Sequence, residues 1–178
     1  ENNHNLIGSA FDARAYGVQV PDISTVADAK MAIDAARFYP IGNRGVCRFV
    51  AAADYGEKEK TTYFEDANKG LLILQIEGKQ GIENLEEILS VTGFDILFVG
   101  PYDLSQSLGY PGQIAHPKVK EEILKIKDLA NSKNIMLGAF ADTEENYQFL
   151  VENKFDYIAY SVDVNLFING LKKIKSEL

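Results

Sequence analysis

The sequence predicts an α/β fold built on a parallel β-sheet. Short, almost continuously apolar segments alternate along the chain with longer segments whose apolar residues recur at helical spacing. Strands that are apolar on both faces are typical of parallel sheets covered by helices. No G-x-G-x-x-G motif follows a predicted strand, and no G-x-x-x-x-G-K-[ST] motif occurs. Two architectures stay open on this pattern, a doubly wound sheet and a (β/α)8 barrel.

The first strand and the first helix are predicted near the N-terminus. Residues 16–21 form a short apolar strand. Thr25 and Asp28 then give an N-terminal capping pattern for a helix that ends near Phe38 and Pro40. Residues 42–69 contain three glycines and the charged run GEKEK. We therefore expect a long loop there that has room for one helix.

The remaining strands and helices are predicted in regular alternation. Apolar strands are predicted over residues 71–76, 95–99, 135–140 and 157–161. Helices are predicted over residues 82–89, 117–132 and 143–153, and a last helix, capped by Asp163, runs to the C-terminus. His116 stands before Pro117, so its simplest role is structural, at the start of a helix. We expect residues 1–178 to form a single domain, because this length suits one hydrophobic core.

Composition argues against several classes of protein. The net charge of −8 and the pI of about 4.8 argue against nucleic-acid binding, which needs clustered Lys and Arg. We expect no membrane association, since no apolar stretch approaches the ~20 residues of a membrane span. The first residues also lack the features of a signal peptide. The single cysteine, Cys47, excludes an internal disulfide and fits a cytoplasmic location.

Two carboxylates follow consecutive predicted strands. Glu77 ends the strand over residues 71–76, and Asp103 lies four residues after the strand over residues 95–99, in the segment GPYDLS. A single helix joins these strands, so they should be neighbours about 5 Å apart and both carboxylates should emerge at one rim of the sheet. Two converging carboxylates suit a hard divalent cation such as Mg²⁺ or Mn²⁺. The alternative is that each carboxylate caps the helix or turn that follows it.

Three segments carry a resemblance to a known family: PIGNRGV, LQIEGKQGIENLEEIL and FVGPYDLSQSLGYPGQIAHPKV. They resemble the HpcH/HpaI aldolase family, the class II, metal-dependent pyruvate aldolases, and the likeness extends from about Gly17 to the C-terminus. The resemblance implies a (β/α)8 TIM barrel that lacks most of its N-terminal strands here, with the fourth to eighth strands recognisable. It also implies that Glu77 and Asp103 bind a divalent metal cation, Mg²⁺, Mn²⁺ or Co²⁺.

The resemblance further implies a carbon–carbon lyase that acts on a small 2-oxo acid. The cation would stabilise the enolate of a pyruvate unit, so that a 4-hydroxy-2-oxo acid is cleaved to, or formed from, pyruvate and an aldehyde. The loop that contains Gly100, Tyr102 and Asp103 would bind the substrate carboxylate. Gln75 points the same way as Glu77 by strand alternation, so it would bond to substrate or metal-bound water, or else be a buried structural amide.

Two further residues resemble functional positions of the family. Arg44 lies in a segment similar to the family's P-x-G-x-R-G loop and would pair with a substrate carboxylate, or else form an exposed structural salt bridge. His4 lies in ENNHN, which looks like the D-x-E-H segment after the second strand, where a catalytic histidine sits. His4 would be that residue, or else Asn2 aligns at the histidine position. About a dozen residues separate His4 from Gly17, where the family has a helix and a third strand with an arginine, so Arg14 is not given that arginine's role.

A complete barrel of this kind needs about 250 residues, so we expect the sequence to be part of a longer protein. Two alternatives to the aldolase stay open. One is a citrate- or malyl-CoA lyase-like enzyme, although this acidic chain offers no obvious basic groove for acyl-CoA. The other is a non-catalytic barrel remnant that serves as a binding or assembly module.

The last predicted helix carries an apolar stripe of Leu166, Phe167, Leu171 and Ile174. The resemblance implies a homo-oligomer that exchanges this helix between subunits, commonly a hexamer built as a trimer of dimers. The same stripe would also suit a helix packed on its own barrel.

Overall fold

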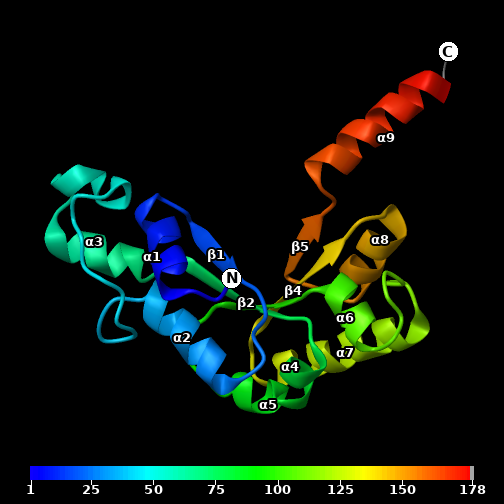
Figure 1. Cartoon of the computed structure of the whole chain (residues 1–178), viewed down its shortest axis with the longest axis horizontal. Helices are drawn as coiled ribbons and strands as arrows, with labels where there is room; N and C mark the ends of the chain where they lie inside the picture. The colour runs from blue at the N-terminus through cyan, green and yellow to red at the C-terminus, as the bar shows by residue number, and fades with distance from the viewer. Residues whose placement is uncertain (177–178) are drawn as a thin grey trace.

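The computed structural model describes residues 1–176, and these contain a five-stranded parallel sheet. Its strands are β1 (Gly17–Val20), β2 (Leu71–Ile76), β3 (Ile96–Val99), β4 (Met136–Ala141) and β5 (Tyr157–Tyr160). The order across the sheet is the order along the chain. A doubly wound sheet reverses its strand order, whereas a (β/α)8 barrel does not. Figure 1 shows the strands curling as a half-barrel with helices around the convex side. The predicted partial TIM barrel, with all five of its strands, is confirmed.

Helices separate the strands. They are α1 (His4–Asp12), α2 (Val26–Ala36), the 3-10 helix η1 (Ala51–Gly56), α3 (Lys60–Ala67), α4 (Lys79–Glu83), α5 (Leu85–Ile88), α6 (Pro101–Ser107), α7 (Pro117–Ser132), α8 (Glu144–Glu152) and α9 (Asp163–Ser176). The sequence did not predict α1 or α6, and the helix predicted over residues 82–89 is divided into α4 and α5. Residues 177–178, the end of the predicted last helix, lie outside the described residues.

The starts of α2 and α7 have the expected capping contacts, whereas Asp163, which was predicted to cap the last helix, is instead the first residue of α9. Thr25 and Asp28 form a complete capping box at the start of α2. The Nδ1 atom of His116 accepts a hydrogen bond from the backbone N–H of Lys118 (3.2 Å), and Pro117 is the first residue of α7. The structural role predicted for His116 is therefore confirmed.

The strand β2 shows how the sheet separates its two faces. Leu72, Leu74 and Ile76 are fully buried in the large core between the sheet and the helices. Ile73 belongs instead to a smaller cluster with Ile96 and Phe98 on the other face. Because side chains alternate along a strand, the polar residue Gln75 lies on the same face as Ile73. The concave face of the sheet thus combines an apolar floor with polar groups at one end.

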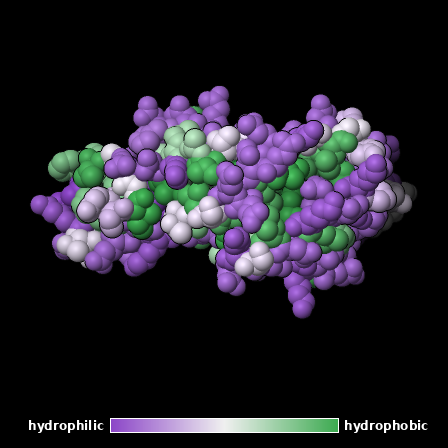
Figure 2. Space-filling model, turned by 90° about the horizontal axis from the view of Figure 1, so that it is seen from below, coloured by the Kyte–Doolittle hydropathy of each residue, from purple (hydrophilic) through white to green (hydrophobic). Residues whose placement is uncertain are grey.

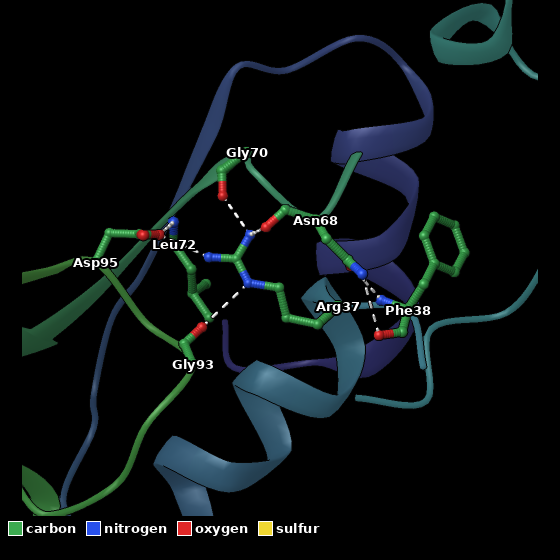
Figure 3. Close-up of polar contacts among 7 residues, drawn as sticks. All are labelled: Arg37, Phe38, Asn68, Gly70, Leu72, Gly93 and Asp95. Carbon is green, nitrogen blue, oxygen red and sulfur yellow. Dashed lines mark hydrogen bonds and ion pairs between the residues drawn. The ribbon is translucent and has the colours of Figure 1, made fainter. Parts of the chain in front are cut away.

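Arg37, the residue after α2, joins three segments at the N-terminal end of the strands (Figure 3). It is 3% exposed. Its guanidinium donates to the backbone oxygens of Gly93 (Nε, 3.1 Å) and Asn68 (Nη1, 3.0 Å), and also to that of Gly70. Its Nη2 atom lies 2.6 Å from Oδ2 of Asp95. Arg37 therefore holds together the segments that lead into β2 and β3.

The helix α9 stands apart from the rest of the molecule (Figure 1). None of its described residues is buried. Leu166, Phe167, Leu171 and Ile174 are each more than half exposed, with Phe167 at 69%. The predicted stripe therefore lies open instead of packing on its own barrel.

The convex side, seen from below in Figure 2, is mostly hydrophilic with hydrophobic patches between the polar residues. In residues 1–176, no helix is both long enough and apolar enough to cross a membrane.

Candidate active site

A cavity of about 600 Å³ lies at the C-terminal ends of the strands. Its apolar floor includes Phe98 and Phe140, which belong to β3 and β4. Polar side chains surround this floor, among them Gln75, Glu77 and Asp103. Barrel enzymes place their chemistry at this end of the strands, whereas the opposite end contributes mainly to stability. We refer to the part of the cavity formed by Gln75, Glu77 and Asp103 as the carboxylate end.

Glu77 follows β2 directly and is only 7% exposed. Its Oε1 atom accepts a hydrogen bond from the backbone N–H of Asp22 (3.0 Å), and its Oε2 atom accepts one from the Gln75 amide. Burial raises the pKa of Glu77, the charge of Asp103 adds to this effect, and the two hydrogen bonds oppose it. Glu77 is therefore a buried carboxylate whose direction is fixed by two hydrogen bonds. No Lys or Arg side chain among the described residues forms an ion pair with it.

The backbone of Gly100 packs directly against the Glu77 carboxylate. A Cβ atom at Gly100 would lie 2.5 Å from Oε2 of Glu77 and 2.8 Å from the Gln75 amide nitrogen. The φ of Gly100 is −85°, which any residue adopts, so glycine is needed here for space and not for backbone conformation. A side chain at this position would displace Glu77.

Asp103 lies in the first turn of α6, where the sequence predicted a loop. The strands β2 and β3 are hydrogen-bonded neighbours, as predicted, and this brings Asp103 to the same cavity as Glu77. Asp103 is exposed and has no side-chain hydrogen bond or ion pair with any residue of 1–176. No group of three or more His, Cys, Asp or Glu side chains in the described part of the chain is placed to hold a metal ion. A cation here would have two carboxylate ligands.

A second polar wall lies across the cavity and was not predicted. Asp142 follows β4, and Ser161 and Asn165 follow β5. The hydroxyl group of Tyr102 donates to Oδ2 of Asp142 (2.5 Å). The rule that singled out Glu77, a polar residue at the C-terminal end of a strand, applies to Asp142 as well and would have found it.

Arg44 is not brought to this cavity. It is 5% exposed and pairs with Asp12, and its guanidinium carbon lies 4.6 Å from the centroid of the Phe38 ring. It lines a different cavity, together with Tyr16 and Gly70, which precede β1 and β2. Arg44 therefore lies near the N-terminal ends of these strands. It forms an ion pair, as the alternative prediction had it, but the predicted exposure was wrong because Arg44 is buried.

His4 is not among the residues that line the cavity either. It is exposed in the first turn of α1. The helix α1 leads into β1 with no strand between them. The resemblance implied a helix and a further strand between this segment and Gly17, so the structure around His4 does not match what the resemblance implied for the catalytic histidine.

The parallel sheet, whose strand order follows the chain, places this protein in the (β/α)-barrel fold class. The family profile described as HpcH/HpaI aldolase/citrate lyase matches residues 1–170. The chain belongs to this family. Aldolases of the family are class II enzymes and are generally metal-dependent.

Relatives in sequence and in structure agree with this assignment. A 2-keto-3-deoxy-L-rhamnonate aldolase of Klebsiella pneumoniae is 43% identical over 97% of this chain and 65% of the relative. An Escherichia coli protein of the same name is 34% identical over 96% of this chain and 64% of the relative. The crystal structure of an HpcH/HpaI aldolase/citrate lyase family protein from Burkholderia cenocepacia matches with a TM-score of 0.92 and 30% identity, over 99% of this chain and 70% of that one. The chain thus spans a little under two thirds of the length of the two aldolases.

Proposed function

We propose that this chain carries the metal-binding part of a class II pyruvate aldolase. The reaction is the reversible cleavage of a 4-hydroxy-2-oxo acid to pyruvate and an aldehyde. The observation that carries the proposal is the convergence of Glu77, Asp103 and Gln75 on one cavity at the C-terminal ends of the strands. The names of the two aldolase relatives support a 2-oxo acid as substrate.

The carboxylate end fits a divalent cation. Carboxylate oxygens are the ligands of hard cations, and Mg²⁺ is commonly held by one or two carboxylates with water and substrate completing its shell. Each Glu77 oxygen accepts one protein hydrogen bond and so has a lone pair left, and the Asp103 carboxylate is unpaired within residues 1–176. Glu77 and Asp103 would hold Mg²⁺, Mn²⁺ or Co²⁺. The bound cation would supply Lewis-acid polarisation of the substrate's 2-oxo group.

The neighbouring residues position the ligands and the substrate. The Gln75 amide donates to Glu77 and fixes the direction of its carboxylate. The backbone N–H groups of Tyr102 and Asp103 have no intrahelical acceptor, since they lie in the first turn of α6, and they would donate to the substrate carboxylate. Because Gly100 has no side chain, its backbone can pack directly against the Glu77 carboxylate. The bond that breaks is then the one between C3 and C4 of the substrate.

Hydrogen exchange of pyruvate tests this function. The protein with Mg²⁺, Mn²⁺ or Co²⁺ in D₂O should exchange the methyl protons of pyruvate, because proton removal from the methyl group is the half-reaction common to all aldehyde partners. EDTA should stop the exchange, and borohydride with pyruvate should trap no adduct. Covalent trapping would indicate a Schiff-base mechanism instead. Absence of both exchange and Mn²⁺ binding would favour the non-catalytic barrel remnant.

We also propose that α9 packs on a second copy of this chain. Its apolar stripe is exposed, and burying it on another subunit would remove that stripe from water. The family resemblance favours a hexamer built as a trimer of dimers.

A further inference from the structure

We propose that Asp142 selects the aldehyde half of the substrate: it binds neutral aldehydes that carry hydroxyl groups and disfavours aldehydes that carry a carboxylate. This inference rests on the proposed aldolase function. It adds a residue and a substrate preference to that function.

Asp142 lies where the aldehyde half of the substrate would extend. It follows β4, two strands away from β2 and Glu77, in the same cavity. Two strand spacings correspond to roughly 10 Å, about the length of a short sugar-acid chain. If the pyruvate unit lies at the carboxylate end, the remaining carbon atoms of the substrate extend either toward β1 or toward β4 and β5. On the β1 side, the Gln19 amide already donates to Gln75 (2.5 Å).

The Asp142 carboxylate is held in place and still has capacity to accept a hydrogen bond. Its Oδ2 atom accepts from the Tyr102 hydroxyl (2.5 Å), and its Oδ1 atom accepts from the Asn146 amide (2.8 Å). An ionised carboxylate has about four acceptor positions, so these two bonds leave others for a substrate hydroxyl. Because both partners are protein side chains, the direction of the carboxylate is set before substrate binds.

The charge of Asp142 disfavours an anionic aldehyde. Partial burial alone would raise the pKa of Asp142, but hydrogen bonds from Tyr102, Asn146 and the backbone outweigh it and lower the pKa, so the group is ionised at neutral pH. Within the described part of the chain, the cavity lining has three carboxylates and no Lys, Arg or His. Beside Asp142, a second substrate carboxylate would therefore meet a like charge, whereas a hydroxyl would meet an acceptor.

Aldol addition of pyruvate to matched aldehydes tests the inference. The aldehydes are glyceraldehyde, propanal, which has the same carbon count without hydroxyls, and succinic semialdehyde, which has a carboxylate. The wild type should prefer glyceraldehyde by kcat/KM. The Asp142→Asn variant keeps the size of the side chain and loses its charge, so the ratio of kcat/KM for glyceraldehyde over succinic semialdehyde should fall by about tenfold to a hundredfold, the range for a hydrogen bond to a charged group.

A neighbouring carboxylate supplies the control. Glu144 lies two residues further on, is exposed and does not line the cavity, so Glu144→Gln removes the same charge and should leave the ratio unchanged. If wild type exchanges pyruvate protons and Asp142→Asn keeps the wild-type ratio, the assignment of Asp142 is wrong while the aldolase proposal stands. If wild type shows neither exchange nor addition, both proposals are wrong.

Discussion

Glu77 and Gly100 show how a single cavity residue depends on the space around it. Glu77 was predicted from its position after an apolar strand, and the structure adds that the carboxylate is buried and fixed by Asp22 and Gln75. The need for glycine at position 100 could not be predicted from the sequence. It arises from a close approach between residues that are adjacent only after β2 and β3 pair.

Removing either carboxylate should abolish tight Mn²⁺ binding. Glu77→Gln and Asp103→Asn each take away one of two charged oxygen ligands, and calorimetric titration with Mn²⁺ should show at least a tenfold loss of affinity. Circular dichroism should stay unchanged, because neither carboxylate holds the core. Asp128→Asn on the exposed face of α7 is the matched control and should bind Mn²⁺ like wild type. Unchanged affinity in either cavity variant would contradict the site.

Gly100→Ala should weaken Mn²⁺ binding by about tenfold or more, since the new methyl group would displace the Glu77 carboxylate. Gly78→Ala provides the control at the residue after Glu77, because a Cβ atom there meets nothing within 4 Å and its φ is −112°. Equal Mn²⁺ affinity in the two variants would show that Glu77 tolerates the displacement.

At the scale of strands and helices, the sequence was informative where periodicity is strong. The five strands and the helix α7 follow directly from apolar runs and helical spacing. The helix α6 was missed because it has only 7 residues and because Gly100 and Pro101, the apparent loop signal, are in fact its start. The helix α1 was also missed, although at 9 residues it is as long as the predicted α8. Asn84 divides the helix predicted over residues 82–89. In residues 42–69, η1 and α3 pack around Phe38 and Tyr63, a tertiary cluster that no local pattern indicates.

The roles of Arg37 and Arg44 also depend on tertiary contacts that no local sequence pattern indicates. Both are buried cations whose partners lie far away in sequence, so neither role could be derived from neighbouring residues. The resemblance of the GNRG segment favoured a role at the substrate, and the fold instead places Arg44 near the opposite end of the strands.

Arg37→Ala should destabilise the protein by about 2–4 kcal/mol, because it leaves backbone carbonyl groups without a donor and breaks an ion pair that is buried on the Arg37 side. The change leaves the carbonyl groups of Gly93 and Asn68 without the Arg37 donor, and the Asp95 carboxylate keeps only the hydrogen bond from the backbone N–H of Leu72. Urea denaturation followed by circular dichroism measures the free energy of unfolding. Lys69→Ala removes an exposed ion pair with Asp66 and should leave the midpoint nearly unchanged. A similar midpoint in both variants would contradict the structural role of Arg37.

At the scale of the whole molecule, the half-barrel alone does not explain why the apolar stripe of α9 is exposed. This stripe was predicted from sequence, but whether it would pack on its own barrel depended on the direction of the chain after β5. In the structure, the chain after β5 extends away from the half-barrel, and α9 does not pack on it (Figure 1).

Replacing Phe167 and Leu171 by Glu should convert the oligomer to monomers, because charges on the stripe would be costly to bury against a second copy. Light scattering coupled to size exclusion measures the mass. Lys172→Glu, on an exposed residue outside the stripe, should keep the wild-type mass. A wild type that is monomeric at micromolar concentration would contradict the proposed packing.

The connection into α9 has a consequence for how activity depends on protein concentration. Ser161, Val162 and Asn165 line the cavity, and the Asn165 amide donates to the Ser161 hydroxyl (2.9 Å). If a neighbouring subunit fixes the direction of α9, it also fixes this wall, and subunit association and ligand binding become thermodynamically linked. Specific activity should then fall when the protein is diluted below the dissociation constant of the oligomer. Because linkage is reciprocal, saturating Mn²⁺ and pyruvate should lower that dissociation constant.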